Sequence, residues 1–210
     1  MTLPRELKTI IFDCDGVMFQ SIKANQAYYN HLLKHFGRGP MNDEELEYVH
    51  IHNVMDSIQY IFRNYPDRPE EIHAYRSQVS YHPFLKYMQI EPDLIPFLEA
   101  TKSRFNLAIA TNRTDTMEAL LDEFSLTGYF GKVQTASNSR KPKPAADPLL
   151  EILEHFDNTV DEAIFIGDST VDEETAKNCG MRLVAFKNKA LDSACYIENF
   201  TELLNLLPIK

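Results

Sequence analysis

The chain has 210 residues, of which 44% are hydrophobic and 25% are charged, and its formal net charge at pH 7 is −10. These fractions are those of a globular protein with a buried core, and the length fits one domain with an insertion or one domain plus a small second one. The negative charge argues against binding to nucleic acid or to an anionic membrane surface, because both require basic protein surfaces. An anionic substrate would therefore need locally concentrated positive charge.

Cysteine usage indicates a reducing compartment. Cys14, Cys179 and Cys195 are odd in number and widely separated, which fits neither a disulfide framework nor a zinc site. The N-terminal sequence MTLPRELK lacks the hydrophobic segment of a secretory signal, and no hydrophobic run approaches the length of a membrane span. We therefore expect a cytoplasmic protein without a membrane partner. The sequence holds no signal for the oligomeric state.

The first predicted element is a short buried strand that ends in two acids. Thr9–Phe12 is a nearly uninterrupted hydrophobic run, typical of a strand covered on both faces. Asp13 and Asp15 follow it, and alternation along an extended chain would place both carboxylates on the same side. Two like charges this close require a cation or a shared proton. Gly16 then allows a tight backbone turn.

The segment from residue 21 to residue 88 is predicted to be entirely helical. Asn42 and Glu45 have the spacing of a helix N-cap and its return partner. The predicted helices run from Ile22 toward Gly37, from Asn42 through Val49, from Val54 to Tyr65 and from Pro69 to Tyr81. We interpret residues 21–88 as a lid domain inserted into a core domain that comprises residues 1–20 and 89–210.

From Pro92 onward, helices alternate with hydrophobic strands. The predicted strands are Asn106–Ala110, Val133–Thr135, Ala163–Ile166 and Arg182–Phe186. The predicted helices are Asp93–Ser103, Asp115–Phe124, Pro148–His155, a helix that ends at Gly180, and Thr201–Leu206. This alternation predicts an α/β fold with a doubly wound parallel sheet.

Polar side chains follow three of the predicted strands, at the point where each strand ends. They are Asp13 with Asp15, Thr111 with Asn112, and Asp168 with Asp172. Because the carboxyl ends of parallel strands lie at one edge of a sheet, we expect these groups to converge into one site.

The converging groups suit a magnesium ion and a phosphate. Asp13, Asp15 and Asp168 offer oxygen ligands without imidazole or thiolate, which is the ligand set that Mg²⁺ prefers. The two loops expected to meet at this edge carry four basic residues: Arg113, Arg140, Lys141 and Lys143. Either of the two lysines could neutralise a phosphoryl group. These parts suit phosphoryl transfer, in which a carboxylate can be the nucleophile.

Four sequence motifs at these positions make the predicted function more specific. In chain order they are DCDGV, TNR, KPKPAADP and GDSTVD. Together they resemble the haloacid dehalogenase superfamily of phosphohydrolases, and the helical insertion resembles the α-helical cap of that superfamily. The resemblance covers nearly the whole chain. It implies a Rossmann-like core, Mg²⁺ as cofactor and a small phosphorylated metabolite as substrate.

The resemblance also implies roles for the two acids of the first motif. Asp13 would be the nucleophile that forms an aspartyl-phosphate. Asp15 would protonate the leaving oxygen and then activate water, and its backbone carbonyl would bind the metal. This second acid argues against true dehalogenation and against phosphonate cleavage, because the corresponding branches of the superfamily lack it.

The other motifs would hold the phosphoryl group and the metal. Thr111 and a lysine would bind phosphoryl oxygens, and the run after Lys143 matches the superfamily better than the run after Lys141. Asp168 would complete the metal site, with Asp172 acting behind it or through water. The further candidates for substrate binding are Gly16, Asn112, Arg113 and Lys141.

The sequence leads to one preferred function and two alternatives. We expect a Mg²⁺-dependent phosphatase acting on a small phosphorylated metabolite. The alternatives are a phosphosugar mutase of the same family and a non-catalytic, receiver-like phosphate-binding protein. His50 and His52 in the lid are candidate substrate contacts, and Gln20 stands where many such caps carry an aspartate.

Overall fold

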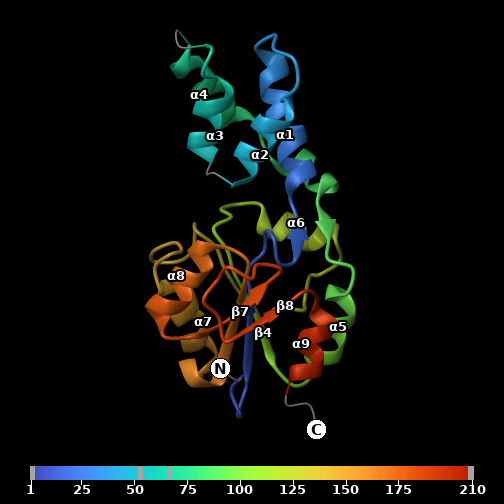
Figure 1. Cartoon of the computed structure of the whole chain (residues 1–210), viewed down its shortest axis with the longest axis vertical. Helices are drawn as coiled ribbons and strands as arrows, with labels where there is room; N and C mark the ends of the chain where they lie inside the picture. The colour runs from blue at the N-terminus through green and yellow to red at the C-terminus, as the bar shows by residue number, and fades with distance from the viewer. Residues whose placement is uncertain (1–2, 52–53, 66–67, 208–210) are drawn as a thin grey trace. The chain divides into compact units, whose positions relative to one another are not determined.

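The structure is a computed structural model that describes residues 3–51, 54–65 and 68–207. The chain divides into two compact units, one made of Met1–Gln20 with Ile90–Lys210 and the other of Ser21–Gln89 (Figure 1). The predicted insertion, 21–88, differs from the second unit by one residue, and its role as a lid stays a prediction.

Six parallel strands form the sheet of the first unit. They are β1 (Thr9–Phe12), β4 (Asn106–Ala110), β5 (Lys132–Gln134), β6 (Ala163–Gly167), β7 (Arg182–Phe186) and β8 (Cys195–Ile197). Their order in the sheet is β5-β4-β1-β6-β7-β8. The chain places β4 and β5 on one side of β1 and then β6, β7 and β8 on the other, so the strand order reverses beside β1. Open α/β sheets bind ligands at such a reversal, outside the carboxyl ends of the strands.

Helices cover both faces of this sheet (Figure 1). They are α5 (Leu94–Thr101), α6 (Met117–Glu123), α7 (Asp147–Phe156), α8 (Thr170–Cys179) and α9 (Phe200–Leu206). Ile11 of β1 belongs to a buried cluster that includes Leu149 of α7. The next residue, Phe12, instead packs its ring against Phe97 of α5 and Phe200 of α9, with centroids 6.0 and 5.9 Å away. Consecutive strand residues thus point into two different cores, which confirms the predicted doubly wound sheet.

The elements predicted for this unit are present, with ends that differ by one or two residues. Four short elements were not predicted. They are β8, the 3-10 helix η2 (Val160–Glu162), and the two-residue strands β2 (Phe19–Gln20) and β3 (Gln89–Ile90), which pair with each other. Segments of two or three residues are too short to show a hydrophobic period, so sequence patterns cannot identify them.

The described residues of the second unit form helices around a core of their own. The helices are α1 (Ile22–His35), α2 (Asp43–Ile51), α3 (Val54–Ile61), α4 (Pro69–Gln78) and the 3-10 helix η1 (His82–Tyr87). Tyr28 and Leu32 of α1 pack there with Ile58 and Ile61 of α3. The predicted ends of α3 and α4, at Tyr65 and Tyr81, were too late. In α4 the backbone becomes extended at Val79 (φ −87°, ψ 109°), which ends the helix.

The predicted N-cap of α2 is confirmed. Asn42 Oδ1 accepts a hydrogen bond from the Glu45 backbone N–H at 2.8 Å, and Glu45 Oε2 accepts one from the Asn42 N–H at 3.2 Å. Glu45 is 1% exposed, and its Oε1 also accepts from Arg38 (2.6 Å) and Arg63 (2.9 Å). Burial raises the pKa of Glu45, but these hydrogen bonds outweigh that effect and the net pKa is lowered. A buried carboxylate of this unit is therefore fully paired.

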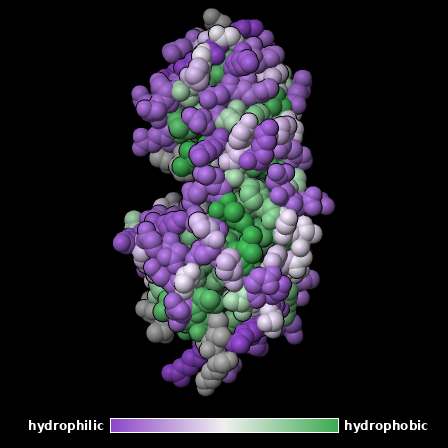
Figure 2. Space-filling model, turned by 90° about the vertical axis from the view of Figure 1, so that its right-hand side faces the viewer, coloured by the Kyte–Doolittle hydropathy of each residue, from purple (hydrophilic) through white to green (hydrophobic). Residues whose placement is uncertain are grey.

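Hydrophilic residues cover most of the face shown in Figure 2, on which a hydrophobic patch is also visible on the first unit. Large hydrophobic residues that are exposed, such as Ile95 on α5 and Met55 on α3, are few among the described residues. Within the described ranges, no helix is both long and hydrophobic enough to cross a membrane.

Candidate active site

The polar groups that follow β1, β4 and β6 lie at one edge of the sheet. Phe12, the last residue of β1, pairs with Ile109 of β4 on one side and with Ile166 of β6 on the other. The Asp13 backbone N–H then donates to the Ile166 carbonyl at 2.9 Å. The three strand ends are thus in register, which places the residues that follow them at the same edge of the sheet.

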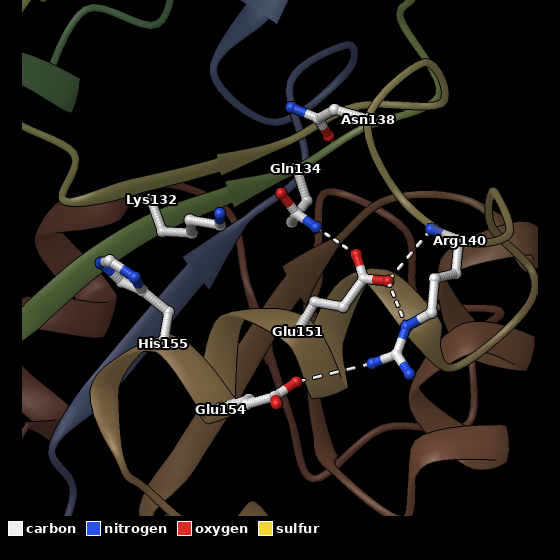
Figure 3. Close-up of a pocket in the computed structure, with 7 residues that line it drawn as sticks. All are labelled: Lys132, Gln134, Asn138, Arg140, Glu151, Glu154 and His155. Carbon is white, nitrogen blue, oxygen red and sulfur yellow. Dashed lines mark hydrogen bonds and ion pairs between the residues drawn. The ribbon is translucent and has the colours of Figure 1, made fainter.

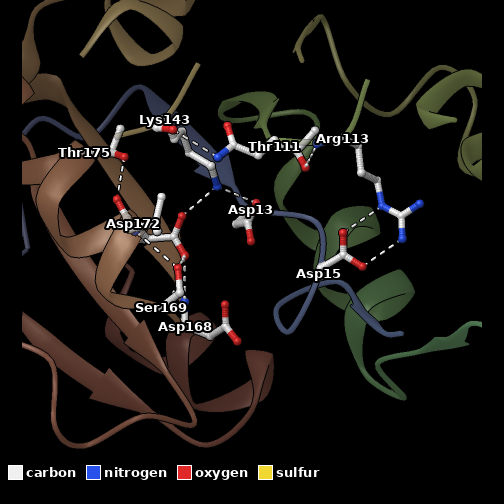
Figure 4. A network of polar contacts seen from close by, with 11 residues as sticks. Asp13, Asp15, Thr111, Arg113, Lys143, Asp168, Ser169, Asp172 and Thr175 are labelled. Atoms are coloured by element: carbon white, nitrogen blue, oxygen red, sulfur yellow. Dashed lines mark hydrogen bonds and ion pairs between the residues drawn. The ribbon is translucent and has the colours of Figure 1, made fainter. Parts of the chain in front are cut away.

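Lys143 joins two of these acids (Figure 4). Its Nζ lies 2.6 Å from Asp13 Oδ1 and 2.6 Å from Asp172 Oδ1. The lysine side chain is 4% exposed, and the Asp172 side chain is fully buried. A buried ammonium between two carboxylates is a fixed arrangement, because either acid without it would be an unpaired buried charge. The sequence left Lys141 and Lys143 as alternatives, and the structure places Lys143 at the acids, whereas Lys141 is exposed.

Asp168 completes a cluster of three acids. One carboxylate oxygen each of Asp13, Asp168 and Asp172 can be chosen so that all three lie within 4.8 Å of one another. Three carboxylates face one ammonium there, so the cluster is more negative than Lys143 alone can neutralise. Oxygen donors in a cluster with excess negative charge fit a hard divalent cation such as Mg²⁺.

The electrostatics of the cluster agree with this interpretation. Burial raises the pKa of Asp13 well above its usual range; Lys143 lowers that pKa and Asp172 raises it again. The pKa of Asp168 is raised to about 7, mainly by burial and then by Asp172. A bound cation would favour the charged form of both carboxylates, which is the form needed by a nucleophile and by a metal ligand.

Asp15 does not join this cluster. Both of its carboxylate oxygens accept from Arg113, with Nε–Oδ2 and Nη2–Oδ1 distances of 2.7 Å (Figure 4). The sequence predicts that strand alternation places Asp13 and Asp15 on the same side. β1 ends at Phe12, however, so the alternation of a strand does not continue through these two residues. Asp15 therefore has a cation of its own, supplied by the TNR motif.

The remaining predicted residues have distinct surroundings. Thr111 is buried, and its Oγ1 accepts a hydrogen bond from the Arg113 backbone N–H at 3.2 Å. Asn112 Nδ2 donates to the backbone carbonyl of Lys143 at 3.0 Å. Asn112 thus ties the loop after β4 to the loop that carries the buried lysine.

Position 16 requires a glycine, because its backbone lies very close to the side chain of Asp168. A Cβ at this position would lie 1.9 Å from Asp168 Oδ2, and the backbone has φ +80°. We expect Gly16→Ala to displace Asp168, to lower the phosphate release expected from the sequence by at least about 100-fold and to cost about 1–3 kcal/mol of stability. Phosphate release and thermal unfolding measure both effects. Gly39→Ala, with no atom within 4 Å of its Cβ, is the control. Parent-like activity in Gly16→Ala would contradict the close approach.

The raised pKa of Asp168 predicts a pH-dependent stability in chelator. The folded protein keeps a proton on this acid up to about pH 7, whereas the unfolded chain releases it near the usual value of 3.8. The free energy of unfolding should therefore fall as pH rises from about 4 to 7, by at most about 4 kcal/mol. Urea unfolding in EDTA at pH 5 and pH 8 should show the fall in the parent and a smaller one in Asp168→Asn. Equal falls in both proteins would rule out Asp168 as its source.

Two residues that the sequence analysis missed position the acids. Ser169 is the N-cap of α8: its Oγ accepts from the Asp172 backbone N–H, and Asp172 Oδ2 accepts from Ser169 Oγ at 2.6 Å. The spacing of a capping box in GDSTVD could have indicated this contact. Asn188 Nδ2 donates to the Asp168 carbonyl at 2.8 Å from the loop after β7, and it has no comparable sequence signal.

Arg140 was predicted to lie among the basic residues of the site, and this prediction is wrong. It pairs with Glu151 at 2.9 Å and with Glu154 at 3.5 Å. These residues line a separate surface pocket with Lys132, Gln134, Asn138 and His155 (Figure 3). Arg140 is therefore paired with two glutamates of α7 and is not part of the candidate site.

Gln20 has a partner of its own. Its Nε2 donates to Glu91 Oε1 at 2.8 Å, and Lys187 Nζ reaches both oxygens of the buried Glu91 at 2.7 Å. Many caps of this kind carry an aspartate at the position of Gln20. Here the carboxylate beside this position belongs to Glu91. The predicted contacts of His52 and of the His50 side chain lie outside the described residues.

Comparisons with known proteins agree on one family. Residues 10–186 match the model of the haloacid dehalogenase-like hydrolases. The chain is 25% identical over 178 residues to a phosphoglycolate phosphatase of Aquifex aeolicus, covering 84% of this chain and 83% of the relative. It is 24% identical over 215 residues to the pyrophosphatase PpaX of Bacillus velezensis, covering 98% and 99% of the two chains.

A solved structure gives a closer match. It is a hydrolase of the same superfamily, subfamily IA, from Geobacter sulfurreducens, with 34% sequence identity and a TM-score of 0.89. The match covers 99% of this chain and 100% of the other. The similarity therefore extends over the core and the helical unit alike.

Proposed function

Because the chain belongs to the haloacid dehalogenase-like hydrolase family, we propose that it hydrolyses a small phosphorylated metabolite through an aspartyl-phosphate on Asp13, with Mg²⁺ as cofactor. It is a phosphatase of this family. The observation that carries the proposal is the contact of Asp13 with Lys143 at the end of the central strand, beside two further acids.

The proposed reaction has two steps. In the first, an oxygen of Asp13 attacks the phosphorus, the bond from phosphorus to the leaving oxygen breaks, and Asp15 gives that oxygen a proton. In the second, Asp15 takes a proton from a water molecule, whose oxygen attacks the phosphorus. The bond between phosphorus and the Asp13 oxygen breaks, so inorganic phosphate leaves and the Asp13 carboxylate is restored. One residue thus acts first as acid and then as base.

The other residues would bind the phosphoryl group and the metal ion. Lys143 and Thr111 would bind the phosphoryl oxygens, and the ammonium offsets negative charge that develops there. Mg²⁺ would be held by Asp13, the Asp15 carbonyl and Asp168, and it would add positive charge at the phosphoryl group.

Asp172, Asn112 and Gly16 would support this arrangement. Both oxygens of Asp172 already accept hydrogen bonds, from Lys143 and from the Ser169 region, so its proposed role is to fix these groups from behind the metal. A substrate contact by Lys141 stays a prediction. The three cysteines are unpaired, which supports the predicted cytoplasmic location.

Phosphate release from a panel of substrates tests the proposal. The panel contains phosphoglycolate, pyrophosphate, sugar phosphates, nucleotides and pyridoxal phosphate, each with Mg²⁺ or with chelator. We expect metal-dependent release from at least one of them and none in Asp13→Asn. A labelled protein intermediate that hydroxylamine removes would identify the acyl phosphate.

The same panel distinguishes the two alternatives. A phosphosugar mutase would isomerise a sugar phosphate with little release of phosphate. A receiver-like protein would bind phosphate without turnover of any substrate. Asp15 favours the phosphatase, because a receiver needs no acid for a leaving group.

A further inference from the structure

We propose that Glu91 is a positioning residue of the metal site: its buried carboxylate joins the segment after β1 to the loop after β7, and it thereby holds Asp168 where a divalent cation binds. The inference rests on the proposed function, because it takes Asp168 as a metal ligand. It deepens that function by adding a residue that acts from outside the cluster of acids. It starts from three hydrogen bonds that converge on Glu91.

The place of the Asp168 carboxylate depends on its backbone. Among the residues that the structure describes, no side chain donates a hydrogen bond to this carboxylate (Figure 4). The backbone of Asp168 has two anchors instead. Its N–H donates to Asp172 Oδ2 at 3.3 Å, and its carbonyl accepts from Asn188 Nδ2 at 2.8 Å. Asn188 makes the shorter contact, so the loop after β7 contributes to placing this acid.

The loop that carries Asn188 begins with a residue in an uncommon conformation. Lys187, between the end of β7 and Asn188, has φ +55°, in the left-handed region that few residues other than glycine adopt. Such a conformation persists only where the surrounding structure holds it. The Lys187 backbone N–H donates to the Ile197 carbonyl at 2.9 Å, and Lys187 Nζ lies 2.7 Å from each oxygen of Glu91. Glu91 thus helps to hold the turn from which Asn188 reaches Asp168.

Glu91 also holds the segment that follows β1. Its Oε1 accepts from Gln20 Nε2 at 2.8 Å, and its backbone N–H donates to the Met18 carbonyl at 2.9 Å. Met18 and Gln20 follow Gly16, whose backbone lies close to the Asp168 side chain. One carboxylate therefore joins the two parts of the chain between which Asp168 is placed.

The burial of Glu91 makes this junction persistent. The side chain of Glu91 is 4% exposed, whereas that of Lys187 is 38% exposed. A buried carboxylate that lost these partners would be an unpaired charge, so its contacts with both parts of the chain are kept together. Glu45 of the second unit is a matched residue: it is 1% exposed and paired with two arginines, but its partners do not contact the acids.

Metal binding in the absence of substrate tests the inference. Titration calorimetry with Mg²⁺ compares the parent with Glu91→Gln, Lys187→Met and Asn188→Ala. Removing a residue that supports a metal ligand lowers metal affinity about 10- to 100-fold, so we expect each variant to bind Mg²⁺ at least about 10-fold more weakly. Lys187→Arg, which keeps the cation, should bind more tightly than Lys187→Met. Glu45→Gln should lose stability but bind Mg²⁺ as the parent does.

A double variant shows whether Glu91 acts through Lys187. Once one partner of the pair is removed, removing the other should have little further effect. Glu91→Gln with Lys187→Met should therefore bind Mg²⁺ within about twofold of the weaker single variant. Phosphate release supplies a second readout. In Glu91→Gln it should return toward the parent's rate as Mg²⁺ is raised, because Asp13 and Lys143 are unchanged.

Parent-like Mg²⁺ affinity in Glu91→Gln would overturn the inference, and so would an equal loss of affinity in Glu45→Gln, since stability alone would then explain the effect. Lys187→Met changes an exposed residue and decides the question if Glu91→Gln does not fold. Asp168→Asn separates this failure from that of the proposed function. If it binds Mg²⁺ as tightly as the parent does, or if the parent binds none, the proposed metal site is refuted and the inference with it.

Discussion

Asp13→Asn is expected to lower phosphate release by about 10⁴-fold or more, because the amide cannot attack phosphorus as the carboxylate does. The substitution keeps the size of the side chain and removes one of three clustered acids. Lys143 keeps its second partner, Asp172, at 2.6 Å. The variant should therefore fold as the parent does. In chelator its thermal unfolding temperature should be equal to that of the parent or higher. Steady-state release and labelling of the protein with radioactive phosphate measure the chemical loss.

The control for this variant is Asp15→Asn. It keeps the proposed nucleophile but lacks the group proposed to activate water, so label should enter slowly and persist on the protein. No label should appear in Asp13→Asn under the same conditions. Persistent turnover in Asp13→Asn would mean that water or another group attacks the phosphorus directly. It would refute the proposed aspartyl-phosphate intermediate.

The sequence predicts the fold well because its short hydrophobic runs are separated by segments with a helical pattern. β1, β4, β6 and β7 are buried strands whose composition alone distinguishes them from the helices between them. Polar groups directly after such strands must meet at one edge, whatever their separation along the chain. This is why Asp13 and Asp168, which follow β1 and β6, could be expected near each other although they lie far apart along the chain.

Other features of the site depend on competition between partners, which no local pattern encodes. Arg113 and Arg140 both lie in loops near the expected site, yet one pairs with Asp15 and the other with Glu151. Which carboxylate each guanidinium reaches depends on loop geometry and on the placement of α7. Asn188 contacts the Asp168 carbonyl for the same reason, from a loop that the sequence does not link to the site.

Lys143→Met is expected to be the most destabilising single change in the first unit's polar network. It leaves Asp13 and Asp172 buried without their common cation, and breaking a buried pair costs about 3–5 kcal/mol. Activity should fall by about 10²- to 10³-fold as well, since the charge proposed to stabilise the phosphoryl group is lost. Urea unfolding in chelator at pH 8 and phosphate release with Mg²⁺ measure the two effects. Lys102→Met, which removes an exposed pair with Glu99, should change stability much less.

A second substitution separates the two consequences of Lys143→Met. Adding Asp172→Asn removes one of the unpaired acids, so the double variant should regain part of the lost stability, whereas its activity should stay low. This holds even where Lys143→Met alone folds poorly, because the comparison then rests on the double variant and the parent. Activity that returns with stability would show that Lys143 acts only by keeping the site folded. Activity that stays low in a stable protein assigns the ammonium to the phosphoryl group itself.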